Sequence, residues 1–184
     1  ELWIIFNSIG IAYRNLGKYD LALTYYKKDF EINQSHFGIT HRATANSMNN
    51  IAAVYMHKGD YEKALQEYFR SLSEYLKSKP VDLDFVAKLY NNIGATYERQ
   101  GEMDKSIEYY EKAVKQYRLK DNNKYSLAIG LNNLGIAYFK KTDLNLSINY
   151  YKAAIKIAEE LSLFTHPFYA TVNANLAVSY FQAG

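Results

Sequence analysis

Apolar and aromatic residues recur at steps of three and four along nearly the whole chain, which is the period of an amphipathic helix. One such run consists of Met103, Ile107, Tyr110, Val114 and Tyr117. Short segments with Gly or a helix-breaking residue interrupt the period at regular intervals. The pattern predicts nine helices, near residues 2–15, 18–35, 43–57, 60–77, 84–99, 102–119, 124–140, 143–161 and 167–183.

Four of the predicted breaks lie inside the helix pairs. At three of them, Gly17, Gly59 and Gly101 end one helix shortly before the next begins. Glycine suits this position because it adopts the left-handed conformation that ends many helices. The fourth break carries Thr142 instead. Because a β-branched residue tolerates a positive φ poorly, we expect that turn to be built differently or to be less stable.

The chain repeats one unit. Five tyrosines follow each other at spacings of 42, 42, 41 and 42 residues, namely Tyr13, Tyr55, Tyr97, Tyr138 and Tyr180. Self-similarity at such a period indicates helical hairpins stacked into one array. The expected repeats are residues 2–41, 42–82, 83–123 and 124–165, with a half repeat at 166–184, so that 1–184 is a single array cut from a longer chain.

Small residues precede the repeated tyrosines, at Gly10, Ala52, Gly94, Gly135 and Ala177. We expect these positions to allow two helices to approach closely. Tyrosines at recurring positions, including Tyr26, Tyr68, Tyr110 and Tyr151 of the predicted second helices, are interpreted as scaffold, because a buried ring contributes a large contact area. Asp29 departs from the pattern, since Ser71, Ala113 and Ala154 occupy its position in later repeats. A carboxylate there must be paired or exposed.

Composition excludes several functions. The net charge is only +3, with 22 basic and 19 acidic residues scattered along the chain, so nucleic acid is not an expected partner. No apolar run is long enough for a membrane span, and the absence of cysteine favours a cytoplasmic location. The four histidines lack metal-ligand spacing, and no phosphate-binding glycine loop occurs. We therefore expect no metal, no cofactor and no enzymatic activity.

Hairpins with Gly or Ala, then Tyr, a Gly turn, and Ala or Ser with an aromatic residue resemble the tetratricopeptide repeat. The Asn-Asn-Ile/Leu-Gly/Ala segments and the longer period are most similar to kinesin light chains. His41 and His166 share one position before their helices, whereas Leu83 and Tyr125 occupy it in the other two repeats. The resemblance implies an all-α solenoid, a right-handed superhelix of helix pairs whose first helices line a concave groove.

Helical spacing then predicts which side chains face that groove. Four asparagines, which we call the amide row, recur in the first helices at Asn50, Asn92, Asn133 and Asn175, and Asn49, Asn91 and Asn132 form a flanking row beside them. Asn is a mediocre helix former, and its amide complements a peptide unit. The residues predicted to bind peptide are the amide row with Asn46, Lys88, Arg99, Lys140, Ile136 and Phe139. The alternative is that one asparagine of each pair bonds between helices.

The expected function is a protein-interaction module whose concave groove binds an extended peptide of a partner, similar to cargo or adaptor binding by kinesin light chains. Lys88, Arg99 and Lys140 favour an acidic ligand, and Ile136 and Phe139 favour an apolar anchor. The alternative is a structural scaffold or self-association spacer in a larger signalling or ciliary protein, with its groove filled by its own chain or by a second copy. Self-association would use the uncapped fifth repeat.

Overall fold

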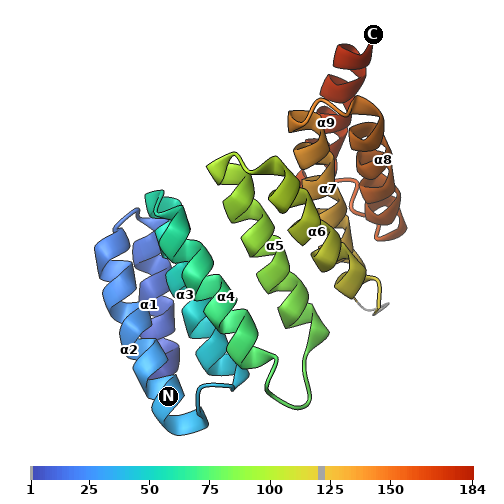
Figure 1. Ribbon diagram of the computed structural model, residues 1–184. Helices are drawn as coiled ribbons and strands as arrows, with labels where there is room; N and C mark the ends of the chain where they lie inside the picture. Colours follow the sequence, from blue (N-terminus) through green and yellow to red (C-terminus); the bar gives the residue numbers. More distant parts are fainter. Residues whose placement is uncertain (1, 120–122) are drawn as a thin grey trace. The chain divides into compact units, whose positions relative to one another are not determined.

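The computed structural model describes residues 2–119 and 123–184, and these residues contain nine α-helices and no β-strand (Figure 1). The helices are α1 (Leu2–Asn15), α2 (Tyr19–Phe37), α3 (Arg42–Lys58), α4 (Tyr61–Tyr75), α5 (Leu83–Gln100), α6 (Met103–Tyr117), α7 (Lys124–Lys140), α8 (Leu144–Glu160) and α9 (Pro167–Ala183). The all-α fold and the order of helices predicted from the period are confirmed. Each end lies within two residues or so of its expected position.

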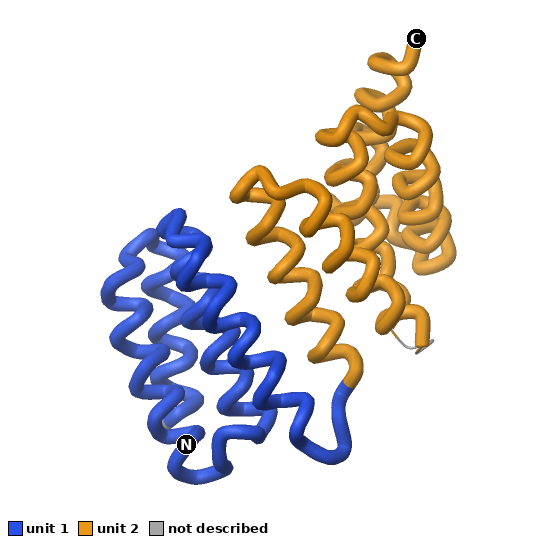
Figure 2. Tube along the Cα trace, viewed as in Figure 1, with its two compact units in different colours: residues 1–82 blue, residues 83–184 orange. Residues whose placement is uncertain are grey.

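The chain forms two compact units, Glu1–Asp82 and Leu83–Gly184 (Figure 2). In unit 1, α1 pairs with α2 and α3 with α4, and α2 packs on α3. In unit 2, α5 pairs with α6 and α7 with α8, while α6 packs on α7 and α9 packs on α8. Each unit is thus built from antiparallel hairpins, and the boundary between the units coincides with the end of the second predicted repeat.

The turn inside each hairpin has one geometry, including the turn at Thr142. Gly17, Gly59 and Gly101 have φ values of 70°, 82° and 89°, and Thr142 has 63°. The residue after Thr142 donates its N–H to the carbonyl of Tyr138 at 3.0 Å, as the residue after Gly59 does to that of Tyr55 at 2.9 Å. The expectation of a different turn is therefore wrong. Tertiary packing imposes the left-handed conformation on a residue that disfavours it.

The seams of the hairpins are closed by tyrosine rings of the second helices. A Cβ atom added to Gly94 would lie 2.7 Å from the Tyr110 ring, and one added to Gly135 would lie 2.5 Å from the Tyr151 ring. These tyrosines are buried, together with Tyr26 and Tyr68 at the same position of the first two repeats. Their scaffold role is confirmed, and glycine is required where the ring lies directly on the facing backbone.

Asp29 lies between α2 and α3 and is only 2% exposed. Its carboxylate accepts hydrogen bonds from Ser47 Oγ at 2.7 Å and Asn33 Nδ2 at 3.0 Å. Burial raises the pKa of Asp29, and these two hydrogen bonds act in the opposite direction. The carboxylate is thus paired as expected, although both of these donors are neutral.

Candidate protein-binding surface

The amide row lies in the middle of the first helices, where it links neighbouring hairpins. In unit 1, Asn50 Nδ2 on α3 donates to Asn7 Oδ1 on α1 at 2.8 Å, and Asn49 Nδ2 lies 3.4 Å from Asn50 Oδ1. Reasoning from the sequence missed Asn7. The repeat register could have found it, because Asn7 lies 42 residues before Asn49 and so occupies the flanking position of the first repeat.

In unit 2 the asparagines form a chain across three helices. Asn175 Nδ2 on α9 donates to Asn132 Oδ1 on α7 at 3.2 Å, and Asn133 Nδ2 on α7 donates to Asn91 Oδ1 on α5 at 2.9 Å. Within α7, Asn132 Nδ2 is 3.5 Å from Asn133 Oδ1, a longer and weaker contact. In both bonds between helices, the amide row donates and the flanking row accepts.

Exposure does not divide cleanly between the two rows. Asn49 and Asn132 of the flanking row are buried, as is Asn50 of the amide row at 9% exposed, whereas Asn91 of the flanking row is partly exposed. Asn92, Asn133 and Asn175 are partly exposed, as is Asn46. An amide has two N–H donors, and each bond to the flanking row uses only one. In unit 2 the amide row therefore combines a fixed orientation with remaining hydrogen-bonding capacity.

The cations predicted to line this surface are not equivalent. Lys140 Nζ forms an ion pair with Glu98 Oε1 at 2.7 Å. The other oxygen of Glu98 accepts a hydrogen bond from the Tyr110 hydroxyl at 2.8 Å. Burial, followed by the charge of Glu98, raises the pKa of Tyr110. Lys140 is thus offset by a carboxylate that also serves a buried tyrosine. Lys140 on α7 and Lys88 and Arg99 on α5 are all exposed.

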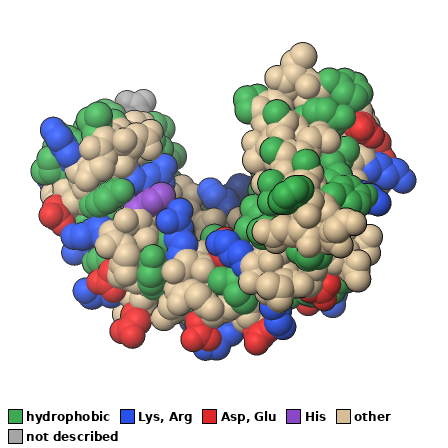
Figure 3. Space-filling view, turned by 90° about the horizontal axis from the view of Figure 1, so that it is seen from above, with side chains coloured by type: hydrophobic (Ala, Val, Ile, Leu, Met, Phe, Trp, Pro, Cys, Tyr) green, Lys and Arg blue, Asp and Glu red, His purple; other side chains and the backbone are tan. Residues whose placement is uncertain are grey.

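The apolar residues predicted for the site belong to α7 and α9. Ile136 and Phe139 are partly buried, and Ile136 packs against the core of unit 2. On α9, Val178 is 49% exposed and Phe181 is 88% exposed. Figure 3 shows that Lys and Arg side chains are interspersed with Asp and Glu on the face drawn there. The surface is therefore mixed in character and has no single block of charge.

The histidines lie at helix ends and in ring contacts. His41 Nδ1 accepts from the N–H of Ala43, and His166 Nδ1 accepts from that of Phe168, both at 3.1 Å. Each histidine therefore caps a helix. Across residues 2–119 and 123–184, no three His, Asp or Glu side chains are grouped so that they could hold a metal ion. No helix in these ranges is both long and apolar enough to cross a bilayer.

Hairpins that stack through Gly and Tyr seams define an α-helical repeat protein. A family model described as tetratricopeptide repeat matches residues 3–73 and 85–160. The chain therefore belongs to the tetratricopeptide repeat family, whose repeats are protein-interaction modules. The resemblance inferred from the sequence is confirmed. A comparison with curated proteins found no match.

Solved structures support the same class. The crystal structure of BtubC (BKLC) from P. vanneervenii has a TM-score of 0.78 and 21% identity over 90% of this chain, which spans 66% of that protein. Repeats of a putative kinesin light chain from Podosopora anserina give a TM-score of 0.78 at 14% identity, over 98% of this chain and 87% of that one. A single-residue variant of those repeats gives a TM-score of 0.77 at 16% identity, over 95% of this chain and 83% of that one. At these identities the likeness is one of fold.

Proposed function

We propose that the first-helix face of unit 2 binds an extended peptide segment of a partner protein. The observation that carries this proposal is the chain of amides from Asn175 to Asn91, which fixes the orientation of Asn133 and Asn175 while each keeps a second N–H. An amide both donates and accepts, so it can bond a ligand's main chain whatever its side chains are.

The spacing of the helices suits an extended ligand. α5 contacts α7, and α7 contacts α9. Neighbouring packed helices lie about 8–10 Å apart, and an extended chain advances about 3.3 Å per residue. A strand crossing this face would therefore meet one member of the amide row about every three residues, which makes a peptide of about ten residues long enough to reach all three helices.

The ligand's side chains follow from the rest of the face. Lys88 and Arg99 on α5 favour acidic residues at one end, although exposed ion pairs contribute only about 0.2–1 kcal/mol each. Ile136 and Phe139 on α7 favour an apolar anchor further along. Lys140 contributes less attraction for acids than its charge suggests, because a ligand carboxylate must compete with Glu98 for it.

Two paired substitutions test the proposal. Asn133→Ala with Asn175→Ala removes the exposed row, and Asn91→Ala with Asn132→Ala removes the flanking row. Either pair abolishes the same two bonds between helices, so the structural cost is matched. The probe is an array of labelled random peptides of about ten residues, with binding of the selected peptides measured by fluorescence anisotropy.

We expect selected peptides to lose more affinity for the first pair, which removes the ligand-facing amides, than for the second, which leaves those amides in place but no longer fixes their orientation. Two ligand hydrogen bonds correspond to about 1–3 kcal/mol, or about 5- to 150-fold in Kd. Equal effects of the two pairs would mean that the asparagines only hold the hairpins together. Retention of full affinity by Asn133→Ala with Asn175→Ala would remove the basis of the proposal.

A second candidate function is self-association through α9. Its side chains Val178, Tyr180 and Phe181 form an exposed apolar flank, on a helix whose buried residues are only Val172 and Ser179. Contiguous apolar surface of this kind often contacts another chain. Phe181→Glu should then shift a concentration-dependent dimer to monomer in sedimentation velocity, whereas a protein that is monomeric at all concentrations would reject this role.

A further inference from the structure

Each unit has a groove between two successive second helices, on a side of the hairpins that the proposed peptide site does not use. In unit 1 the groove lies between α2 and α4, with Phe30 and Ile51 in its lining and a volume of about 310 Å³. In unit 2 it lies between α6 and α8, with Val114 and Leu134 at the equivalent positions and a volume of about 450 Å³. The two grooves differ in what covers this apolar lining.

The groove of unit 1 is covered by its own side chain. The guanidinium of Arg70 lies 5.3 Å from the centroid of the Phe30 ring, and Arg70 also pairs with Glu67 at 3.7 Å. The repeat register places Ala153 of α8 at the position of Arg70. A methyl group cannot reach across the groove, so no long side chain of α8 at this position covers Val114 and Leu134, which form the floor of the groove and are 5% and 1% exposed.

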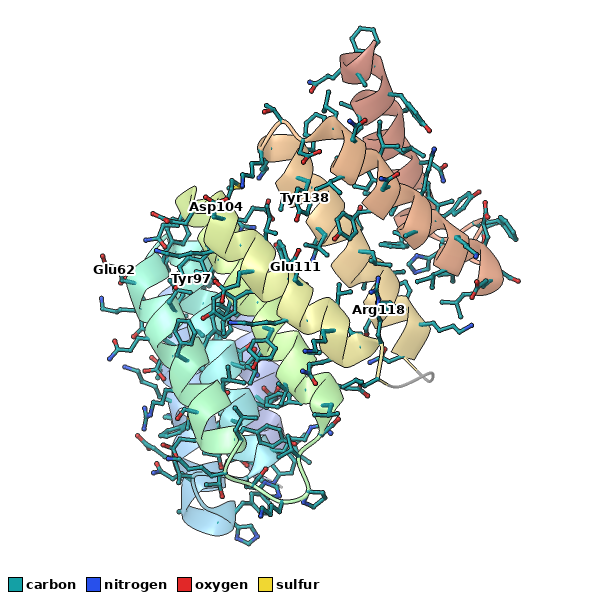
Figure 4. All side chains as sticks on the ribbon, turned by 45° about the vertical axis from the view of Figure 1, so that its right-hand side comes forward. Glu62, Tyr97, Asp104, Glu111, Arg118 and Tyr138 are labelled. Carbon is teal, nitrogen blue, oxygen red and sulfur yellow. The ribbon has the colours of Figure 1, made fainter. Side chains whose placement is uncertain are left out.

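The groove of unit 2 also has an excess of positive charge, because its lining contains two cations, Lys115 and Arg118, and one carboxylate, Glu111. Lys115 lies on α6 and Arg118 is its C-terminal cap; both are exposed, and neither forms an ion pair with a described residue. Glu111 accepts a hydrogen bond from the Tyr138 hydroxyl at 3.2 Å. Figure 4 shows Glu111 and Arg118 following each other along α6, with Tyr138 on the next helix. The guanidinium of Arg118 acts on the Tyr150 hydroxyl, where it opposes the rise in pKa that burial and Glu111 cause.

The groove of unit 1 is different in this respect too. Glu31 stands where Lys115 stands, Gln34 where Arg118 stands, and Lys27 where Glu111 stands. Its lining therefore contains two cations and two carboxylates, Lys27, Arg70, Glu31 and Glu67. Of these two grooves, the one in unit 2 combines an apolar lining that no arginine covers with an excess of cations over carboxylates.

We propose that the groove between α6 and α8 binds an amphipathic helix of a partner protein, with apolar side chains on Tyr150 and Leu119, above the floor of Val114 and Leu134, and carboxylates facing Lys115 and Arg118. Lining residues 111, 114 and 115 of α6, with Arg118 at its C-terminal cap, form one face of two helical turns. A face about 11 Å long accepts the ridge of a neighbouring helix, as in helix-in-groove recognition. Leu119, which is 63% exposed, extends the apolar surface at the cationic end.

The test uses two labelled amphipathic peptides of about 16 residues, a length at which isolated helices become stable. One has leucines on one face flanked by glutamates, and the other has lysines in place of the glutamates. Binding is measured by fluorescence anisotropy to the whole chain and to three variants. These are Lys115→Glu with Arg118→Glu, Ala153→Arg, and the control Lys27→Glu with Arg70→Glu, which makes the same change in net charge on the groove of unit 1.

The acidic peptide should bind the unaltered chain, and its Kd should rise about tenfold or more when Lys115 and Arg118 are reversed. Ala153→Arg should weaken binding because the new side chain covers the groove, as Arg70 does in unit 1. The control should bind as the unaltered chain does, and the lysine peptide should prefer the reversed variant. Circular dichroism verifies that each variant is folded.

Four results would overturn the proposal. The acidic peptide could show no binding up to about 1 mM, a limit that corresponds to only about 4 kcal/mol. It could bind the Ala153→Arg variant as well as the unaltered chain, or lose equal affinity in the control, which would indicate nonspecific attraction. Finally, the paired variant Asn133→Ala with Asn175→Ala could lose affinity for the acidic peptide while the groove variants keep it. That result would place the peptide on the amide row, and would leave the proposed function standing.

Discussion

Replacing Asp29 by Ala, the residue found at this position in two later repeats, should stabilise unit 1 at neutral pH. The carboxylate is buried and its bonds come from the neutral donors Ser47 and Asn33. Both donors retain an acceptor in the variant. Ser47 Oγ lies 3.1 Å from the carbonyl of Ala43, and Asn33 Nδ2 lies 3.0 Å from Ser47 Oγ. The substitution thus removes a desolvated charge, and it leaves without an acceptor the N–H of Asn33 Nδ2 that now donates to Asp29.

The direction of the pH dependence follows from the pKa of Asp29, which burial raises above its ordinary value. The folded protein then holds the proton more tightly than the unfolded chain does. Stability from this proton is fully present below the unfolded pKa of about 3.9 and is lost as the pH rises through the folded pKa. Each unit of difference between the two pKa values corresponds to about 1.4 kcal/mol.

The assay is urea unfolding followed by circular dichroism, between about pH 4 and about pH 8, for the unaltered chain, Asp29→Ala and Asp29→Asn. The difference in unfolding free energy between either variant and the unaltered chain should grow with pH. We expect it to reach about 1–2 kcal/mol at neutral pH, within the usual cost of a buried polar group. The Asn variant keeps the shape of the side chain and so separates the charge from packing.

A difference in unfolding free energy that stays constant across this pH range would refute the reasoning. It would mean that Asp29 has the same pKa in the folded and unfolded states, so that desolvation does not destabilise its charge. A difference that falls with pH would mean that Asp29 is held as a carboxylate by its two donors. Other titrating groups cancel in the comparison, since all three proteins share them.

Four further substitutions test the turns and seams. Thr142→Gly should raise the unfolding free energy by about 1 kcal/mol, because φ is 63° at this residue. Gly59→Thr should lower the unfolding free energy at the equivalent turn. Unchanged urea midpoints in both variants would contradict this expectation. Gly135→Ala should cost about 1–3 kcal/mol because the new Cβ would lie 2.5 Å from the Tyr151 ring. Ala52→Gly should cost the helix-propensity difference of about 1 kcal/mol and, because Ala52 is fully buried, about 0.8 kcal/mol more for the lost methyl group; thermal unfolding compares the two seams.

Local patterns were enough to predict the helices, because each one combines a clear apolar period with a turn residue at its end. For α5 the pattern predicted 84–99, and the helix runs from Leu83 to Gln100. The same local reasoning failed at Thr142. There the intrinsic preference of one residue opposes the packing of α7 on α8, and the packing determines the backbone.

The candidate site was predictable in position but not in bonding. The period placed Asn133 and Asn175 on the first helices, and both lie there. Their hydrogen bonds join residues 42 and 43 positions apart, as does the ion pair of Lys140 with Glu98 at a separation of 42. Helical spacing describes one helix at a time, so it cannot assign partners across neighbouring repeats. Whether these residues bind peptide stays a prediction.

In unit 2, the bonds that Asn133 and Lys140 already make determine which contacts a peptide can form without breaking one. Asn133 already donates to Asn91, and Lys140 already pairs with Glu98. A peptide that used Lys140 would leave Glu98 with only the Tyr110 hydroxyl, and an exposed charge pair returns little energy. A peptide that used the second N–H of Asn133 would break nothing. Binding should therefore depend more on the peptide main chain than on its charge, and random peptides selected for affinity should share an apolar residue rather than an acidic one.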